Sequence, residues 1–198
     1  MTTLLIATKN AGKAREYRQM LAADDIEIKT LADYEQPLQV EETGKTFEEN
    51  ATLKATAAVK AYHVPVLADD SGLQVDALNG APGIYSARYA GDHDDAANNA
   101  KLLKNLKGVP AAKRTAHFHT TIVALKPNGA KLVANGQVDG RILDRPRGHD
   151  GFGYDPLFYV PELQQTMGQL TTDQKDAISH RGRALRDLLK GFDQWWQV

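Results

Sequence analysis

The segment LADDSGLQVDALNGAPGIYSARYAG, residues 67–91, joins an apolar run to two adjacent aspartates and then to a series of glycines. The apolar run completes a predicted strand over residues 64–68, which we expect to end at Asp69 and Asp70. Neighbouring carboxylates at the end of a buried strand repel each other, and burial adds to the cost of ionising them. A cation or a proton in the same site would offset that cost, whereas carboxylates that cap backbone turns would need neither.

Strands and helices alternate on the N-terminal side of this segment. Apolar runs predict strands at residues 4–8 and 26–31, with a helix between them. A capping box formed by Thr46 and Glu49 predicts the start of a second helix, which leads into the strand at 64–68. The apolar stripe of that helix consists of Phe47, Ala51, Ala55, Ala58 and Tyr62. The β-α-β order predicts an α/β fold, a mixed central β-sheet flanked by helices.

The C-terminal half continues this pattern. Alternating apolar residues over 116–124 predict a long strand, and the PNGA turn at 127–130 predicts a hairpin to the next strand. A last helix is predicted to begin at His180 and to bury Leu185, Leu188 and Leu189. No repeat or linker interrupts the chain. We therefore expect residues 1–198 to form a single domain, with any second lobe as an excursion from it.

The composition excludes several classes of function. The chain has 24 Lys and Arg against 25 Asp and Glu, a formal net charge of −1, so we expect no nucleic-acid partner and no membrane partner. It has no cysteine, which excludes disulfides and thiolate metal sites and is compatible with a reducing cytoplasm. The apolar run LLIA near the N-terminus is too short for a signal sequence or a membrane span. We expect a cytoplasmic protein in which local positively charged groups bind any anionic ligand.

The loop TKNAGK, residues 8–13, is a candidate phosphate site because it joins a buried strand to a helix. Backbone N–H groups at a helix N-terminus attract anions, and Lys9 and Lys13 add positive charge. The alternative is an exposed polar turn with two solvated lysines. The GKT triplet at 44–46 is not a P-loop, because Gln39 stands where a P-loop requires glycine and no strand leads into it.

The paired aspartates suit a divalent cation, since Mg²⁺ prefers hard oxygen ligands. A phosphatase of the haloacid dehalogenase type would need the pattern Asp-x-Asp, but Asp70 is followed by Ser71 and a glycine. The acidic pair Glu41 and Glu42 is a second source of carboxylates, with a solvated pair as its alternative. Asp69 and Asp70 could equally serve as caps of the turns that follow them.

Two C-terminal motifs suit recognition of a flat ring. GFGYDP, residues 151–156, combines glycines that allow close backbone approach with aromatic rings that can stack, although it could also be an ordinary turn beside the core. SHRGRAL, residues 179–185, offers His180 and Arg181 as donors to a carbonyl or phosphate, or as solvated groups. His117 and His119 lie on one strand face without an evident third ligand, and we interpret them as structural.

Together, TKNAGK, EETGKTFEENATLKA, the segment at 67–91, GFGYDP and AISHRGRAL resemble the inosine triphosphate pyrophosphatase family, the Ham1-like XTP/dITP diphosphatases. The resemblance runs in order from residue 4 to about residue 190. It implies an ITPase-like mixed sheet in two lobes with a cleft between them. It also implies a Mg²⁺-dependent homodimer that hydrolyses dITP, ITP and XTP to the nucleoside monophosphate and pyrophosphate.

The resemblance also implies roles for particular residues. Asp70 would be the catalytic base, and Glu42 and Asp70 would face the metal, with Glu41 as a rival one position away. Lys54 would lie near the phosphates, and Ser71 would touch the nucleotide. The loop that would hold the phosphates consists of Thr8, Lys9, Asn10, Ala11, Gly12 and Lys13. The nucleotide-recognition residues would be Phe152 as the stacking ring, Gly153, Tyr154, Asp155, Lys175, His180 and Arg181.

Two other functions are weighed against this one. A Maf-like nucleotide pyrophosphatase would act on other bases, and a panel of nucleotides assayed for pyrophosphate with Mg²⁺ separates the two. A regulatory module that binds nucleotide without turnover would gain little from a carboxylate that activates water, and incubation with dITP and Mg²⁺ tests it directly.

Overall fold

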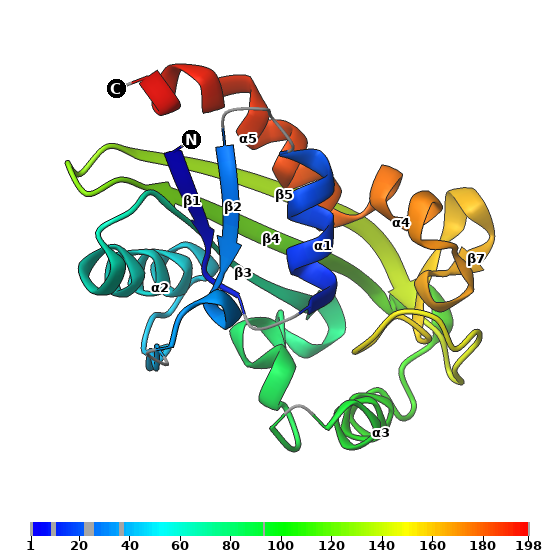
Figure 1. Cartoon of the computed structure of the whole chain (residues 1–198). Coiled ribbons are helices and arrows are strands. Elements are labelled where there is room, and N and C mark those ends of the chain that lie inside the picture. The colour runs from blue at the N-terminus through cyan, green and yellow to red at the C-terminus, as the bar shows by residue number, and fades with distance from the viewer. Residues whose placement is uncertain (1, 9–10, 22–25, 36–37, 93, 198) are drawn as a thin grey trace. The chain divides into compact units, whose positions relative to one another are not determined.

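The computed structural model describes residues 2–8, 11–21, 26–35, 38–92 and 94–197. Its seven strands form one sheet in the order β2-β1-β3-β4-β5-β6-β7. β1 pairs in parallel with β2 and with β3, whereas β6 pairs antiparallel with β5 and with β7. The predicted α/β fold with a mixed sheet is therefore confirmed (Figure 1). No helix among the described residues has both the length and the apolar composition needed to cross a membrane.

The strands are β1 (Thr2–Ile6), β2 (Ile26–Thr30), β3 (Val66–Val75), β4 (Thr115–Leu125), β5 (Lys131–Ile142), β6 (Phe158–Val160) and β7 (Gln165–Thr166). The α-helices are α1 (Ala11–Met20), α2 (Phe47–Tyr62), α3 (Asp95–Asn105), α4 (Thr172–Ile178) and α5 (His180–Gln197). Short 3₁₀ turns include η1 (Leu31–Asp33) and η3 (Gly83–Arg88).

The chain divides into two compact units, and each is built from separate segments. Unit 1 comprises residues 1–70, 120–136 and 184–198, and unit 2 comprises residues 71–119 and 137–183. Unit 2 is thus made of two excursions of the chain. β3, β4 and β5 each contribute residues to both units.

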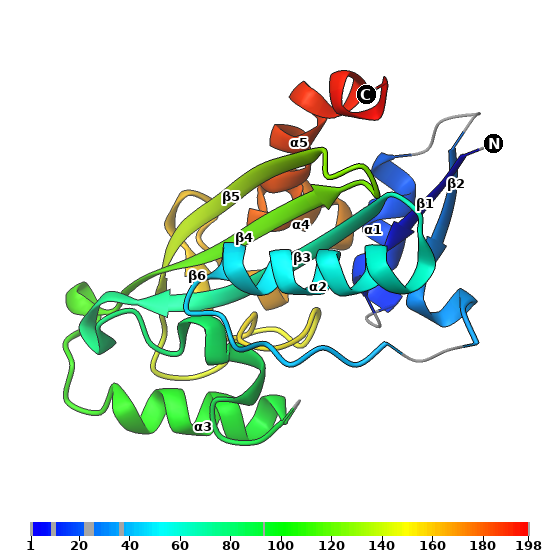
Figure 2. The ribbon, with the colours of Figure 1, turned by 90° about the vertical axis from the view of Figure 1, so that its left-hand side faces the viewer.

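Unit 1 has an apolar core on each face of its strands, because successive strand residues point to opposite sides. Leu4 and Ile6 contact one cluster, which includes Tyr17 of α1 and Leu188 of α5. Leu5 belongs to the other cluster, together with the small residues Ala51, Ala55 and Ala58 of α2. Figure 1 shows α1 and α2 on opposite sides of these strands, and Figure 2 shows α2 running along β3. The alanine stripe lets α2 lie close to the strand that carries the aspartates.

Unit 2 has a core of its own. Its buried side chains include Leu102 and Leu106 of α3, Phe118 of β4 and Phe158 of β6. Phe118 and Phe158 contact each other with ring centroids 4.5 Å apart. This core supports the glycine-rich segment at 151–155, because Tyr154 of that segment is a member of the cluster.

The prediction that a strand ends at Asp69 and Asp70 is wrong. β3 continues to Val75, so both aspartates lie in the middle of a ten-residue strand. Leu73 and Val75 are fully buried and extend the strand beyond the acidic pair. The strand can continue because lysine side chains compensate the two carboxylates, so neither carboxylate has to reach solvent or cap a turn.

Two local predictions also need correction. Thr46 accepts the N–H of Glu49 as predicted, but the Glu49 carboxylate accepts the N–H of Lys45, at 2.6 Å, so the box is only half formed. Leu189 is 40% exposed and lies outside the buried stripe of α5. The predicted start of the last helix at His180 is confirmed, because the extended backbone of Ser179 separates α4 from α5.

Candidate active site

Unit 1 gathers a cluster of charged side chains around the middle of β3. Lys54 of α2 places its Nζ atom 2.9 Å from Oε1 of Glu42 and 3.6 Å from Oδ1 of Asp70. Lys54 and Glu42 are half-buried, and Asp70 is buried. The structure therefore brings together three residues that the family resemblance assigns to one site: Glu42 to the metal, Lys54 to the phosphates and Asp70 to the metal and the base.

Asp69 has a lysine partner of its own. The ammonium of Lys13, on the first turn of α1, forms an ion pair with the Asp69 carboxylate, whose side chain is only 3% exposed. Because strand side chains alternate, Asp69 and Asp70 point to opposite sides of β3. Each therefore meets a different helix, and this separation reduces the repulsion expected for adjacent carboxylates.

The electrostatics of the cluster favour a further cation. Burial raises the pKa of Asp70, the Lys54 ammonium opposes that shift, and the Glu42 carboxylate adds to it. Burial tends to lower the pKa of Lys54, but the carboxylates of Asp70, Asp69 and Glu42 outweigh burial and raise it. Lys54 is thus held as an ammonium, yet two carboxylates share it, which leaves the group short of positive charge.

The carboxylates of Glu42 and Asp70 fit Mg²⁺ as nucleotide enzymes bind it. Mg²⁺ is usually held by one or two carboxylates together with substrate phosphates and water, not by a cage of protein ligands alone. Among the described residues, no group of three or more His, Asp or Glu side chains could hold a metal ion by itself. Glu42 and Asp70 supply two hard oxygen ligands, and a phosphate chain would supply the rest.

The predicted phosphate loop is described only in part. Lys9 and Asn10 lie outside the described residues, and α1 begins at Ala11, so Ala11, Gly12 and Lys13 occupy its first turn. That turn carries no acidic residue. The N-terminal end of the helix therefore keeps its attraction for an anion. Thr8 is half-buried and donates its N–H to the Ile6 carbonyl, at 2.8 Å.

Unit 2 gathers most of the predicted nucleotide-recognition residues. Phe152 exposes 45% of its surface. The Lys175 ammonium lies 5.1 Å and the Arg181 guanidinium 5.7 Å from the centre of its ring. Lys175 also forms an ion pair with the buried carboxylate of Asp155, which accepts the N–H of Phe152 at 3.0 Å. An exposed ring flanked by two cations is suited to stacking on a flat, electron-rich base.

The segment that carries Phe152 is fixed by helix α3. Asp95 accepts the N–H of Gly153 at 2.7 Å, and Asn99 donates to the Gly153 carbonyl at 2.8 Å. Gly153 has φ of +62°, a conformation that glycine adopts at little cost. Sequence reasoning missed Asp95 and Asn99. Their i, i+4 spacing places them on one face of α3, but the spacing alone gives no indication of what that face contacts.

Two further predicted residues, Tyr154 and His180, have side chains with structural contacts. Tyr154 is buried and its hydroxyl donates to the Ser86 carbonyl, at 2.8 Å. His180 is buried and stacks on Phe118, with ring centroids 4.8 Å apart. Ser71 is half-buried and follows Asp70 directly on β3. His117 contacts Gln74 through Nε2, at 3.0 Å, as a structural histidine would.

Sequence reasoning also missed Asn50. This residue is fully buried on α2, and its Nδ2 atom donates to Oδ2 of Asp70 at 3.1 Å. A sequence signal existed, because Asn50 and Lys54 are polar residues one helical turn apart, next to Ala51 and Ala55 of the apolar stripe of α2.

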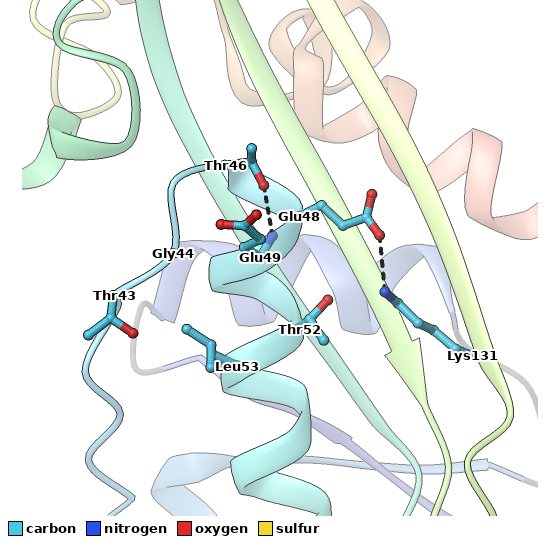
Figure 3. A pocket seen from close by; sticks show the side chains of 8 residues that line it. All are labelled: Thr43, Gly44, Thr46, Glu48, Glu49, Thr52, Leu53 and Lys131. Atoms are coloured by element: carbon cyan, nitrogen blue, oxygen red, sulfur yellow. Dashed lines mark hydrogen bonds and ion pairs between the residues drawn. The ribbon is translucent and has the colours of Figure 1, made fainter.

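A pocket beside the start of α2 does not coincide with this chemistry. It is lined by residues that include Thr46, Thr52 and Leu53, together with an ion pair in which Lys131 and Glu48 lie 3.0 Å apart (Figure 3). None of the predicted site residues lines it. We therefore assign the candidate active site to the charged cluster around Asp70 and not to this pocket.

The chain is similar to known proteins over nearly its whole length. The model of the Ham1 family matches residues 4–191. A dITP/XTP pyrophosphatase of Lactiplantibacillus plantarum is 64% identical over 194 residues, which cover 98% of this chain and 96% of that protein. A dITP/XTP pyrophosphatase of Lactobacillus acidophilus is 55% identical over 192 residues, covering 94% and 95%. The solved structure of the Staphylococcus aureus Ham1 protein matches with a TM-score of 0.88 at 46% identity, covering 98% of each chain.

Proposed function

The chain belongs to the Ham1 family, and from that premise we propose that it is a dITP/XTP pyrophosphatase. It hydrolyses dITP, ITP and XTP to the nucleoside monophosphate and pyrophosphate, and so removes deaminated purines from the nucleotide pool. The observation that carries the proposal is the cluster in which Lys54 contacts both Glu42 and Asp70. It combines a cation for phosphate oxygens with a buried carboxylate that can accept a proton.

The triphosphate is assigned to unit 1. Lys13, Lys54 and the N–H groups at the start of α1 offset the negative charge of the phosphate oxygens. Asp70 accepts a proton from the attacking water, whose oxygen forms a bond to the α- or β-phosphorus while the P–O bond that joins the nucleoside monophosphate to pyrophosphate breaks. Burial raises the pKa of Asp70, which makes it a stronger base than an exposed aspartate.

We assign Mg²⁺ to Glu42 and Asp70. When bound, Mg²⁺ neutralises phosphate charge and acidifies coordinated water. Lys54 holds both carboxylates together before the nucleotide arrives, and Asp69, through its pair with Lys13, anchors the first turn of α1 beside β3.

The base is assigned to unit 2. Phe152 stacks on the purine, while Arg181 and backbone N–H groups near Asp155 donate hydrogen bonds to the 6-oxo group of hypoxanthine or xanthine. Adenine presents an amino donor at that position, so it would leave buried donors without acceptors. Each such mismatch costs roughly 1–3 kcal/mol, which is about ten- to a hundredfold in specificity. Lys175 neutralises Asp155 and keeps Phe152 in place.

A nucleotide panel tests the proposal. The purified chain is incubated with dITP, ITP, XTP, dATP, dGTP and dTTP, with Mg²⁺ or with chelator, and pyrophosphate and inorganic phosphate are measured separately. We expect pyrophosphate release from dITP, ITP and XTP but not from dATP or dTTP, and only with Mg²⁺; dGTP also carries a 6-oxo group, so its rate shows whether the site discriminates at position 2 of the purine. Preference for another base, or sequential release of inorganic phosphate, would contradict it. Hydrolysis in oxygen-18 water then identifies the phosphorus attacked.

We also propose a cytoplasmic homodimer. The family resemblance motivates the dimer, and the absence of cysteine is in keeping with a reducing compartment. Light scattering at several protein concentrations measures the dimer directly, and a mass of 21.7 kDa at every concentration would contradict it.

A further inference from the structure

The side chain of Asn50 contacts both the Asp70 carboxylate and the segment that carries Glu42. Asn50 is fully buried as the fourth residue of α2. Its Nδ2 atom donates to Oδ2 of Asp70 at 3.1 Å, and its Oδ1 atom accepts the N–H of Gly44 at 2.9 Å. Gly44 follows Glu42 by two residues.

These two partners determine the orientation of the carboxamide. A backbone N–H can only donate and a carboxylate can only accept, so only one orientation satisfies both contacts. A flipped amide would direct oxygen at the carboxylate and nitrogen at the Gly44 N–H. With Oδ2 of Asp70 engaged by Asn50, it is Oδ1 that faces Lys54, at 3.6 Å. Asn50 therefore binds one carboxylate oxygen of Asp70 while the other oxygen faces Lys54, and the two contacts together fix the plane of the carboxylate.

Residue 44 has to be small for this contact to form. A Cβ atom at Gly44 would lie 2.6 Å from Oδ1 of Asn50 and 2.7 Å from Cβ of Glu49. Contacts that short do not occur, so any side chain at residue 44 would move the segment away from α2. Figure 3 shows this segment passing close to the first turn of the helix.

We propose that Asn50 is a positioning residue for catalysis, which sets the direction of the Asp70 carboxylate and ties it to the segment that carries Glu42. The inference rests on the proposed function, since it assumes that Asp70 accepts the proton from water. Asn50 need not touch substrate. It acts by keeping the base in one orientation, and misplacement of a catalytic group by about 1 Å can cost on the order of 100-fold in rate.

A second buried asparagine provides a matched control. Asn98 of α3 also ties a loop to a helix, because its Oδ1 accepts the N–H of Ala90 at 2.6 Å and its Nδ2 donates to the Ala87 carbonyl at 3.3 Å. Both of these contacts are to backbone. Asn50→Ala and Asn98→Ala therefore remove comparable buried amides, but only the first removes a donor to the Asp70 carboxylate.

The test measures kcat and KM for dITP with Mg²⁺, at a temperature where thermal melts show each variant folded. We expect Asn50→Ala to lower kcat by about 10- to 100-fold, with KM changed less than about threefold, because binding groups stay in place. Gly44→Ala disturbs the same contact from the loop side and should lower kcat in the same way. It therefore tests the proposal even if Asn50→Ala does not fold. Equal kcat losses for Asn50→Ala and Asn98→Ala would overturn the proposal.

A double-mutant cycle separates positioning from general structural damage. Loss of a general base costs roughly 10²- to 10⁴-fold, so Asp70→Asn keeps a rate that single-turnover measurements with excess enzyme can follow. If Asn50 acts through Asp70, Asn50→Ala should lower that residual rate less than twofold. The same fold loss in both backgrounds would show independent action and overturn the proposal.

Amide exchange supplies a readout that needs neither metal nor turnover. In the metal-free protein, the Gly44 N–H should be protected from exchange and should lose this protection in Asn50→Ala, whereas the N–H of Lys45, which donates to the Glu49 carboxylate, should exchange at the same rate in both proteins. Unchanged Gly44 exchange would overturn the proposed tie. Wild-type protein that fails the nucleotide panel but shows this protection would instead refute the proposed function alone.

Discussion

The ammonium of Lys54 lies 2.9 Å from Oε1 of Glu42, a residue twelve positions earlier in the chain. This ion pair turns Glu42 toward the cluster that holds Asp70. Glu41, its neighbour, is exposed. The geometry therefore favours Glu42 over Glu41 as the residue that would hold a metal ion.

Neutralising Glu42 should weaken the response to Mg²⁺. We expect Glu42→Gln to raise the Mg²⁺ concentration for half-maximal dITP hydrolysis by about 10- to 100-fold, the usual cost of altering a residue at or next to a metal. Glu41→Gln is the matched control and should leave the Mg²⁺ dependence unchanged. A larger effect for Glu41→Gln would reverse the assignment.

Replacing Asp70 should separate activity from stability. Asp70→Asn removes the proton acceptor, and we expect kcat for dITP to fall roughly 10²- to 10⁴-fold. Since burial raises the pKa of Asp70, its stabilising contribution is complete below its ordinary pKa and is lost as pH rises through the folded value. At neutral pH the ionised carboxylate therefore costs stability, and Asp70→Asn should melt at a higher temperature than the wild type.

Thermal melts of both proteins without metal, at pH 7 and at a pH below 3.8, test the expected difference in stability. The difference in Tm should shrink at the lower pH, where the wild-type carboxyl group binds its proton. Near wild-type turnover by Asp70→Asn would remove Asp70 from the mechanism.

Local sequence patterns were enough to predict the order of the strands and helices and the short motifs that carry the polar residues of the site. The alanine stripe of α2 identified a buried helix face, and all its alanines are buried in unit 1. The residues chosen around Asp70 and around Phe152 do lie together, because each belongs to a short motif whose chemistry is readable. The half-formed capping box shows the limit of such patterns, since Lys45 N–H competed for Glu49.

Contacts between distant segments could not be predicted in the same way. The sequence gives no sign that Lys13 would compensate Asp69, or that Lys54 would do so for Asp70, and without these pairs a strand through two aspartates looks too costly. Asn50 was missed because a single polar residue on a helix does not reveal its partner. Helix periodicity identifies a face, but only the fold determines what that face meets.

The exposed ring of Phe152 should contribute to nucleotide binding and little to folding. Stacking of a base on an aromatic side chain contributes about 1–3 kcal/mol, so we expect Phe152→Ala to raise KM for dITP by about tenfold or more with a small change in Tm. Leu163→Ala removes another exposed apolar side chain of unit 2, 41% exposed, and should leave KM unchanged. An unaltered KM for Phe152→Ala would remove the stacking role.

Asp33 should make stability depend on acid pH. The backbone N–H of Thr30, at 2.7 Å, and its hydroxyl, at 2.9 Å, both donate to the Asp33 carboxylate and hold its pKa below the ordinary value of 3.8. A lowered pKa contributes stability above the ordinary value, and that contribution is lost as pH falls through the folded value. Asp33→Asn should therefore lower Tm at pH 7, and the difference in Tm should be smaller at a pH well below 3.8 than at pH 7. Equal Tm differences at both pH values would contradict this account.

Arg181 should determine the preference for a 6-oxo purine. Its side chain is buried, and its guanidinium lies 5.7 Å from the centre of the Phe152 ring, where it can donate to the edge of a stacked base. We expect Arg181→Ala to lower the ratio of kcat/KM for dITP to that for dATP by about ten- to a hundredfold, mainly through a loss on dITP. Arg183→Ala is the matched control, because this exposed arginine of the same helix turn donates to the Gln137 carbonyl at 3.0 Å. Arg181→Lys should not restore the ratio, since a lysine lacks the fixed fork of donors. An unchanged ratio in Arg181→Ala would show that the discrimination against adenine lies elsewhere, and the backbone N–H groups near Asp155 would then be the remaining donors to test.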